Sequence, residues 1–159
     1  MTSNLSRDGD EDMNPDLGIR FEVVYKDVHL VEVRISAWNG TFGGTSDVYI
    51  GQDRLGKTAA EIRGFPRNPA DVREIMLGSN SGPGNHVSMR FYCTDSSGHA
   101  SVDSTIKSAP DAAGKIQSAT FSLPIEASAV DSFVEDLQRL SSSAAGVAIL
   151  NGCPLQARE

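Results

Sequence analysis

The sequence predicts an α+β fold in which an antiparallel sheet of about six strands carries helices packed on one face. Three observations lead to this fold class: segments in which apolar and polar residues alternate, short turn-rich connections between them, and two stretches with helical apolar spacing. The segments follow one another in the order β-β-β-α and then β-β-β-α. Short hairpin connections imply antiparallel neighbours, and each amphipathic helix must bury one side against the sheet.

The chain of 159 residues accommodates one domain, which we expect over residues 18–142. Residues 1–17 carry five acidic side chains against one arginine, which accounts for −4 of the net charge of −7. Such a polar acidic leader is expected to be disordered and solvated. Residues 143–159 form a C-terminal segment, in which the apolar run VAIL is either a last short strand or part of a loose tail.

The first two strands come from IRFEVVY and HLVEVRISAW. Alternation predicts that the core face of the first strand carries Ile19, Phe21, Val23 and Tyr25. Asn39-Gly40 is a strong signal for a two-residue hairpin turn. That turn pairs Trp38 with Thr41 and places Phe42 opposite Ala37 on the core face of the third strand.

A helix is expected where Leu55, Ala59 and Ile62 recur at helical spacing, with Asp53 as its N-cap. Residues 68–71, Asn-Pro-Ala-Asp, predict a second short helix. Strands are expected in VSMRFYCT, HASVDSTIK and IQSATFSLPI. The final helix is predicted by an apolar stripe made of Val130, Phe133, Val134, Leu137 and Leu140.

The stretch GQDRLGKT matches the phosphate-loop pattern through Gly51, Gly56, Lys57 and Thr58. A phosphate loop needs its helix to begin at the glycine–lysine pair, so that free amides face the anion. Here the apolar stripe starts at Leu55, so the helix begins too early, and Gly56 and Lys57 are expected on its outer side. The surrounding hairpins also differ from the parallel sheet of nucleotide-binding folds. Nucleotide binding is therefore kept as an alternative function.

CTDSSGHASVD gathers a cysteine, a histidine and carboxylates, which suggests nucleophilic chemistry. A four-residue loop pairs Thr94 with His99 and Cys93 with Ala100 and places the apolar residues of both strands on the same, core side, whereas a three-residue loop would place them on opposite sides. Cys93 then faces the core and His99 faces away, so the two cannot form a catalytic dyad. We expect no catalytic residue and a non-enzymatic protein.

The same registers collect aromatic, basic and polar side chains on the open face of the sheet, with Arg90 opposite Asp103 as a cross-strand ion pair. Tryptophan, tyrosine and arginine are the residue types that anchor protein partners. The predicted partner-binding residues are Arg34, Trp38, Tyr49, Arg90, Tyr92, His99 and Asp103. Two alternatives stay open: these side chains simply cover an exposed sheet, or two copies of the chain pack there as a homodimer.

Composition excludes several classes of function. The acidic chain has no basic stripe for nucleic acid, and no apolar run is long enough to cross a membrane. The three histidines and two cysteines lack metal-ligand spacing, so neither a metal nor another cofactor is expected. The N-terminus does not have the pattern of a signal peptide, which predicts a cytoplasmic protein with reduced thiols.

Three segments, DRLGKTAAEIRGFP, FYCTDSSGHASV and FSLPIEASAVDSFVEDLQRL, resemble a family of small bacterial proteins of unknown function. In the order of its elements the chain is also loosely similar to the WapI-type immunity proteins, which neutralise polymorphic toxins. The resemblance covers about residues 18–142 and carries no catalytic residue. It implies a toxin-neutralising form of the protein-binding module expected above. Nucleotide binding and a self-associating structural role are the alternatives.

Overall fold

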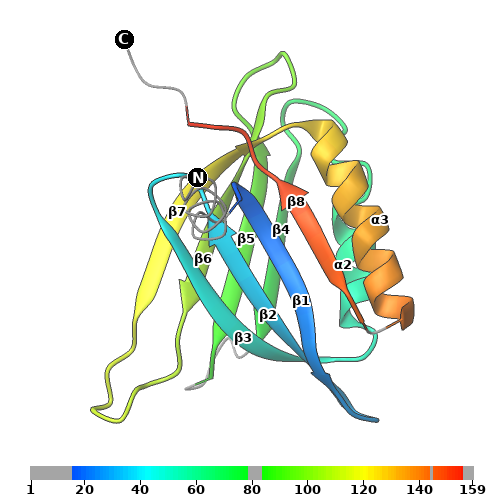
Figure 1. Cartoon of the computed structure of the whole chain (residues 1–159). Coiled ribbons are helices and arrows are strands. Elements are labelled where there is room, and N and C mark those ends of the chain that lie inside the picture. Colours follow the sequence, from blue (N-terminus) through cyan, green and yellow to red (C-terminus); the bar gives the residue numbers. More distant parts are fainter. Residues whose placement is uncertain (1–15, 79–83, 144, 156–159) are drawn as a thin grey trace, which may run out of the picture.

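The computed structural model describes residues 16–78, 84–143 and 145–155. Within these residues the chain forms two four-stranded antiparallel sheets and two helices (Figure 1). The elements, in chain order, are β1 (Gly18–Lys26), β2 (Leu30–Trp38), β3 (Gly43–Gly51), α2 (Arg54–Ile62), β4 (Val72–Gly78), β5 (His86–Cys93), β6 (Ala100–Lys107), β7 (Ser118–Ile125), α3 (Ala127–Ser143) and β8 (Val147–Asn151). The predicted acidic leader lies, apart from its last two residues, outside the described part of the chain.

The first sheet has the strand order β3-β2-β1-β8 and the second has the order β4-β5-β6-β7. The α+β class and the antiparallel pairing are confirmed, whereas the single six-stranded sheet and the repeated β-β-β-α order are wrong. β8 pairs with β1, with Ile19 opposite Leu150 and Phe21 opposite Ala148. Of the two alternatives for the C-terminal segment, the structure therefore has the short strand.

The strand that the sequence pattern missed is β4. Its inward residues, Ile75 and Leu77, are both 1 % exposed, but its outward residues Val72 and Met76 are also apolar. Apolar residues on both faces hide the period of two on which the prediction depends. The short helix predicted over residues 68–71 is absent from the structure, because these residues form a turn in which Asn68 Oδ1 accepts a hydrogen bond from the amide of Ala70.

The two sheets approach each other along β3, which contacts all four strands of the second sheet. On the other side of the molecule, α2 and α3 pack together, with α3 against β8 and α2 against β4 (Figure 1). The helices therefore fill the space between the sheets at one side, rather than covering one face of a single sheet as predicted. The predicted stripe of α3 is confirmed, since all five of its residues are buried.

The core lies between the sheets and the helices, and aromatic rings join its parts. Phe21 of β1 meets Phe133 of α3 edge to face, with ring centroids 5.3 Å apart. Phe65, after α2, meets Phe91 of β5 in the same way at 5.7 Å. All four rings are at most 2 % exposed. Burying a phenylalanine contributes about 1.5–3 kcal/mol, so these contacts stabilise the packing of α3 and of the segment after α2 against the sheets.

The loop between β2 and β3 is longer than the predicted two-residue turn. Trp38 pairs with Gly43 and Ala37 pairs with Gly44, which shifts the register by two residues. Asn39 closes this loop: its Oδ1 accepts hydrogen bonds from the amides at positions 41 and 42, and its Nδ2 donates to the Ser122 carbonyl of β7 at 3.0 Å. A shift of two keeps the inward and outward faces unchanged. Phe42, however, leaves the core face and is 63 % exposed.

A β-bulge changes the end of β1. The pairing with β2 shifts between Val23 and Tyr25, so Val24 is the extra residue. Beyond the bulge the side chains change faces, and Tyr25 is 55 % exposed rather than buried with Ile19 and Phe21 as predicted. The bulge thereby brings a tyrosine to the outer face of the first sheet.

Candidate functional site

The segment that matches the phosphate loop is already helical where a loop would be required. α2 begins at Arg54, before Gly56 and Lys57. The amide of Lys57 donates to the carbonyl oxygen of Asp53 at 3.1 Å, and its ammonium group pairs with the carboxylate of that residue at 3.0 Å. Thr58 is fully buried and its hydroxyl donates to the Arg54 carbonyl. Asp53 occupies the N-cap position, but its side chain makes no capping hydrogen bond, contrary to the prediction.

The two glycines of this motif also have structural surroundings. Gly51 ends β3, and Gly56 faces α3, where a Cβ would lie 3.2 Å from Ser141 Oγ. Gly56 is therefore not on the outer side of the helix, where the sequence placed it. The hollow nearest to this helix start, lined by Lys26, Gln52 and Ser141 among others, has a volume of about 90 Å³. Small-molecule sites usually measure about 300–1,000 Å³, so this hollow has no room for a nucleotide.

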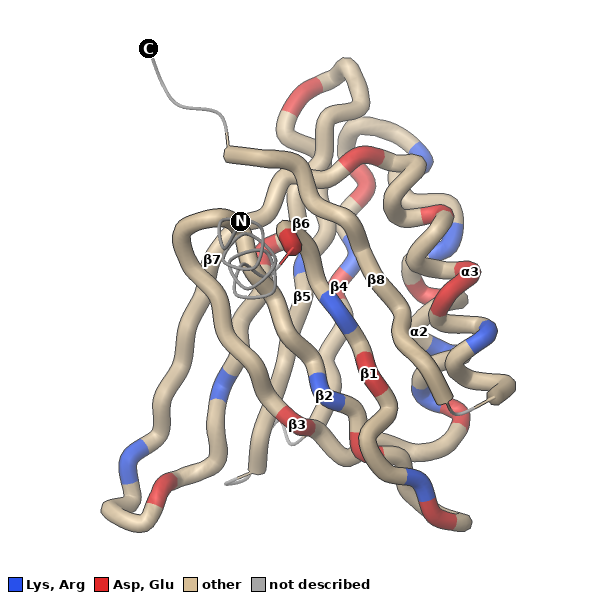
Figure 2. Tube along the Cα trace, in the orientation of Figure 1, with Lys and Arg blue, Asp and Glu red and all other residues tan. Residues whose placement is uncertain are grey.

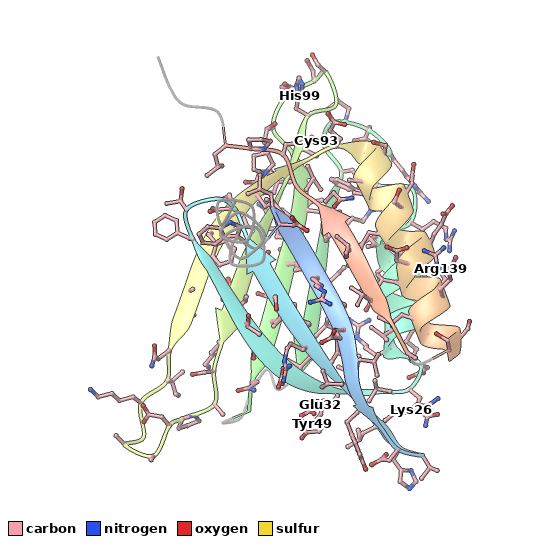
Figure 3. All side chains as sticks on the ribbon, in the orientation of Figure 1. Lys26, Glu32, Tyr49, Cys93, His99 and Arg139 are labelled. Atoms are coloured by element: carbon pink, nitrogen blue, oxygen red, sulfur yellow. The ribbon has the colours of Figure 1, made fainter. Side chains whose placement is uncertain are left out.

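The hairpin around Cys93 has the predicted register. Cys93 pairs with Ala100, and the amide of Thr94 donates to the His99 carbonyl at 2.8 Å. Cys93 packs against the core while His99 lies at the exposed tip, next to Asp95 (Figure 3). His99 Nδ1 is 2.5 Å from Asp95 Oδ2, and this contact lowers the pKa of the Asp95 carboxyl. Cysteine and histidine are not brought together.

The outer face of the second sheet is internally satisfied. Arg90 lies opposite Asp103 as predicted, but the two do not form the predicted ion pair. Arg90 instead lies 3.6 Å from the Glu74 carboxylate and stacks over the ring of Tyr92, with 5.0 Å to its centroid. The carboxylate of Asp103 accepts hydrogen bonds from the Tyr92 hydroxyl at 2.9 Å and from Ser122 Oγ at 2.6 Å. The polar groups of this face therefore bind one another.

The outer face of the first sheet carries a row of three side chains across β1, β2 and β3. Tyr25 lies opposite Glu32, and Glu32 lies opposite Tyr49. We call these three residues the tyrosine row. Tyr25 and Tyr49 are 55 % and 59 % exposed, and Figure 3 shows Tyr49 beside Glu32 at the end of the sheet. Hydrogen bonding to the Glu32 carboxylate, together with its negative charge, raises the pKa of the Tyr49 phenol.

Further exposed apolar side chains surround the tyrosine row at the hairpin between β1 and β2. Val24 is 36 % exposed, Val28 78 % and Leu30 43 %. With the two tyrosines they make up five of the eleven large apolar side chains that are exposed in the described chain. We call Val24, Val28 and Leu30 the apolar margin. Concentrating apolar side chains at one end of one sheet is typical of a protein contact surface.

The neighbouring row on the same face consists of Glu22, Arg34 and Asp47. Arg34 forms a two-pronged ion pair with Asp47, with distances of 2.9 and 3.1 Å, which raises the pKa of the guanidinium. Glu22 pairs with Arg20 at 3.1 Å. Figure 2 accordingly shows acidic and basic positions close together on β1, β2 and β3.

The predicted partner-binding residues thus separate into groups. Arg34 and Tyr49 lie together on the first sheet, whereas Arg90, Tyr92 and Asp103 lie on the second. Trp38 is half-buried at the opposite end of β2, six residues from Glu32, or about 20 Å at strand spacing. A Cβ at its partner Gly43 would lie only 2.7 Å from the Trp38 ring. The indole therefore covers the backbone of β3.

Sequence reasoning missed Tyr25, Glu32 and the apolar margin. The two successive valines in EVVY interrupt the alternation and are the one signal for the bulge that exposes Tyr25. Glu32 was passed over because a single carboxylate on an exposed strand face is ordinary until its neighbours are known.

In the described residues no three histidine, cysteine or acidic side chains form a group that could hold a metal ion. None of the helices in the described part of the chain has the length and apolar character needed to cross a bilayer. Comparisons with family models, curated proteins and solved structures found no match, so the function has to be argued from the site itself.

Proposed function

We propose that this protein is a non-enzymatic protein-binding module that contacts its partner through the tyrosine row and the apolar margin. The observation that carries the proposal is the concentration of exposed tyrosine, valine and leucine side chains at one end of the first sheet. Tyrosine is favoured in interfaces because a large amphipathic ring loses little conformational freedom on binding.

The two outer faces differ in what they offer to a partner. On the second sheet Arg90, Tyr92 and Asp103 bind one another or immediate neighbours. On the first sheet the two tyrosine rings and Val28 are more than half exposed, and Val24 and Leu30 are 36 % and 43 % exposed. A partner that covers them removes apolar area from water without first breaking polar contacts. The first sheet is therefore the better contact surface.

The specific form of this function that we propose is toxin neutralisation. It rests on the resemblance of three segments to small bacterial proteins and on the loose similarity to WapI-type immunity proteins, and it draws no support from the repeated β-β-β-α order, which the structure does not have. A small acidic module with an exposed contact face suits the task, because it needs only to cover its target and performs no chemistry. Cytoplasmic localisation is part of the same proposal.

The test is affinity purification from the source cells with two matched pairs of substitutions. Tyr25→Ser with Tyr49→Ser alters the proposed face, and Val72→Ser with Met76→Ser removes comparably exposed side chains from β4. We expect one protein to be recovered with the wild type and the β4 variant and to be lost with the tyrosine variant. Equal recovery with all three forms would show that the contact lies elsewhere. Recovery of the chain itself as the one tyrosine-dependent species would replace the proposed partner with self-association.

A further inference from the structure

The tyrosine row places a carboxylate between two exposed aromatic rings. Residues directly opposite each other on neighbouring strands have Cβ atoms about 4.5–5.5 Å apart. Glu32, on the central strand of the three, therefore has Tyr25 on one side and Tyr49 on the other. Both rings are more than half exposed. This arrangement offers negative charge at its centre and aromatic faces at its sides.

The cations near the tyrosine row are engaged elsewhere. Arg34 is held by two hydrogen bonds to Asp47, and Arg20 pairs with Glu22. Lys26 is opposite Val31 and lines the hollow beside the helices, away from the outer face. Among the described residues Glu32 has no ion-pair partner. A negative charge with no cation of its own is thus left at the centre of the proposed contact surface.

Two kinds of attraction act on a cation placed at this position. The carboxylate supplies a charge-assisted hydrogen bond or ion pair, and each tyrosine ring attracts a cation lying within about 6 Å of its centroid. Tyr49 lies beside Glu32 across the β2–β3 pair (Figure 3), and the lone pairs of the Glu32 carboxylate are available to an incoming donor. When a partner packs against the apolar margin, water is excluded from the neighbouring tyrosine row.

We propose that the tyrosine row is a receptor for a cationic side chain, the ammonium group of a lysine or the guanidinium group of an arginine, presented by the protein partner. This inference rests on the proposed function, since the cation arrives as part of the contact surface of that partner. The acidic net charge of −7 assists the approach of a basic surface, and Glu32 decides where the cation binds.

The test uses NMR titrations of the isotope-labelled full chain with three capped tripeptides, Ala-Arg-Ala, Ala-Lys-Ala and Ala-citrulline-Ala. The citrulline peptide has nearly the shape of arginine without its charge. We expect saturable shifts at the rings of Tyr25 and Tyr49 with a cationic peptide, and binding about fivefold weaker with citrulline. The difference between the arginine and lysine peptides identifies which cation the site prefers.

Matched variants locate the site. Glu32→Gln should weaken binding of the cationic peptide about fivefold, whereas Glu74→Gln, an exposed carboxylate on the second sheet, should leave it unchanged. Equal weakening by both variants, or shifts spread over all acidic positions, would overturn the proposal. Affinity purification separates this result from the proposed function. A partner retained by Glu32→Gln and lost by Tyr25→Ser with Tyr49→Ser supports the contact surface and rejects the cation receptor.

Discussion

Arg73 is expected to be the most important charged side chain for the stability of this fold. Its guanidinium donates to Asp71 twice, at 3.0 and 2.8 Å, and to the carbonyl oxygens of Glu61 and Arg63 at the end of α2, both at 3.0 Å. It also lies 5.9 Å from the centroid of the Phe65 ring. The side chains of Arg73 and Asp71 are only 18 % and 13 % exposed. One group therefore joins α2, the following loop and β4.

The Arg73→Ala substitution removes four hydrogen bonds and leaves a largely buried carboxylate without its cation. Breaking a buried pair costs about 3–5 kcal/mol, and partial exposure places this case at the lower end, about 3 kcal/mol. That is a large fraction of the roughly 5–15 kcal/mol that stabilises a typical domain. The control is Arg34→Ala, which breaks a pair of the same two-pronged geometry at the surface, where water replaces the lost bonds.

The assay is urea unfolding followed by the fluorescence of Trp38, the one tryptophan of the chain. We expect Arg73→Ala to lower the midpoint strongly and Arg34→Ala to change it little, with similar slopes for both. Because Arg73 lowers the pKa of Asp71 below its ordinary value of 3.8, this stabilisation is present above pH 3.8 and is lost as the pH falls through the folded pKa. If Arg73→Ala and Arg34→Ala lowered the free energy of unfolding equally at neutral pH, burial of the Arg73–Asp71 pair would not make it more stabilising than the exposed Arg34–Asp47 pair.

Two further predictions follow from buried and helical positions. His86 is 9 % exposed, and burial, with the charge of Lys107 as a smaller cause, lowers its pKa. The stability that comes from keeping His86 neutral should therefore be fully present above pH 6.5. Below pH 6.5 the free energy of unfolding should fall by up to about 1.4 kcal/mol per pH unit, and a His86→Gln variant should show a flatter profile in pH-dependent urea titrations. Millimolar Mg-ATP or Mg-GTP should leave the melting temperature unchanged in a thermal-shift assay, because Lys57 and Thr58 are already engaged within α2; a stabilisation that Lys57→Ala abolishes would restore the phosphate loop as a binding site.

Local patterns determine the parts of the fold that the sequence could predict. In the hairpin of β5 and β6 a four-residue loop places the apolar residues of both strands on the same side. The predicted register is confirmed from His86 opposite Lys107 to Cys93 opposite Ala100. The five-residue stripe of α3 is likewise a local property of the chain.

Long-range contacts determine the parts that the sequence could not predict. The β2–β3 register depends on the Asn39 side chain, which donates to Ser122, 83 residues away. The division into two sheets depends on which strands become hydrogen-bonded neighbours in the folded chain. The alternation of apolar and polar residues within one strand does not specify its neighbours. β4 was hidden because Val72 and Met76 make its outer face apolar too.

The candidate site was predictable only in part for the same reason. Arg34 and Tyr49 follow from the alternation within their strands, which the register shift of two did not change. Tyr25 reaches the outer face through the bulge at Val24, and Glu32 gains significance only when β1 and β3 place a tyrosine on each side of it. The single predicted face became two because the second hairpin belongs to another sheet.

Site-specific photo-crosslinking in the source cells would show whether the outer face of the first sheet is the contact surface. A benzophenone amino acid would replace Tyr49 in one form of the protein and Met76 of β4, which is similarly exposed, in the other. We expect a crosslink to a second protein from position 49 that is absent from position 76. A crosslink to a protein from position 76 alone, or the same crosslinked protein from both positions, would rule out the tyrosine row as the specific contact.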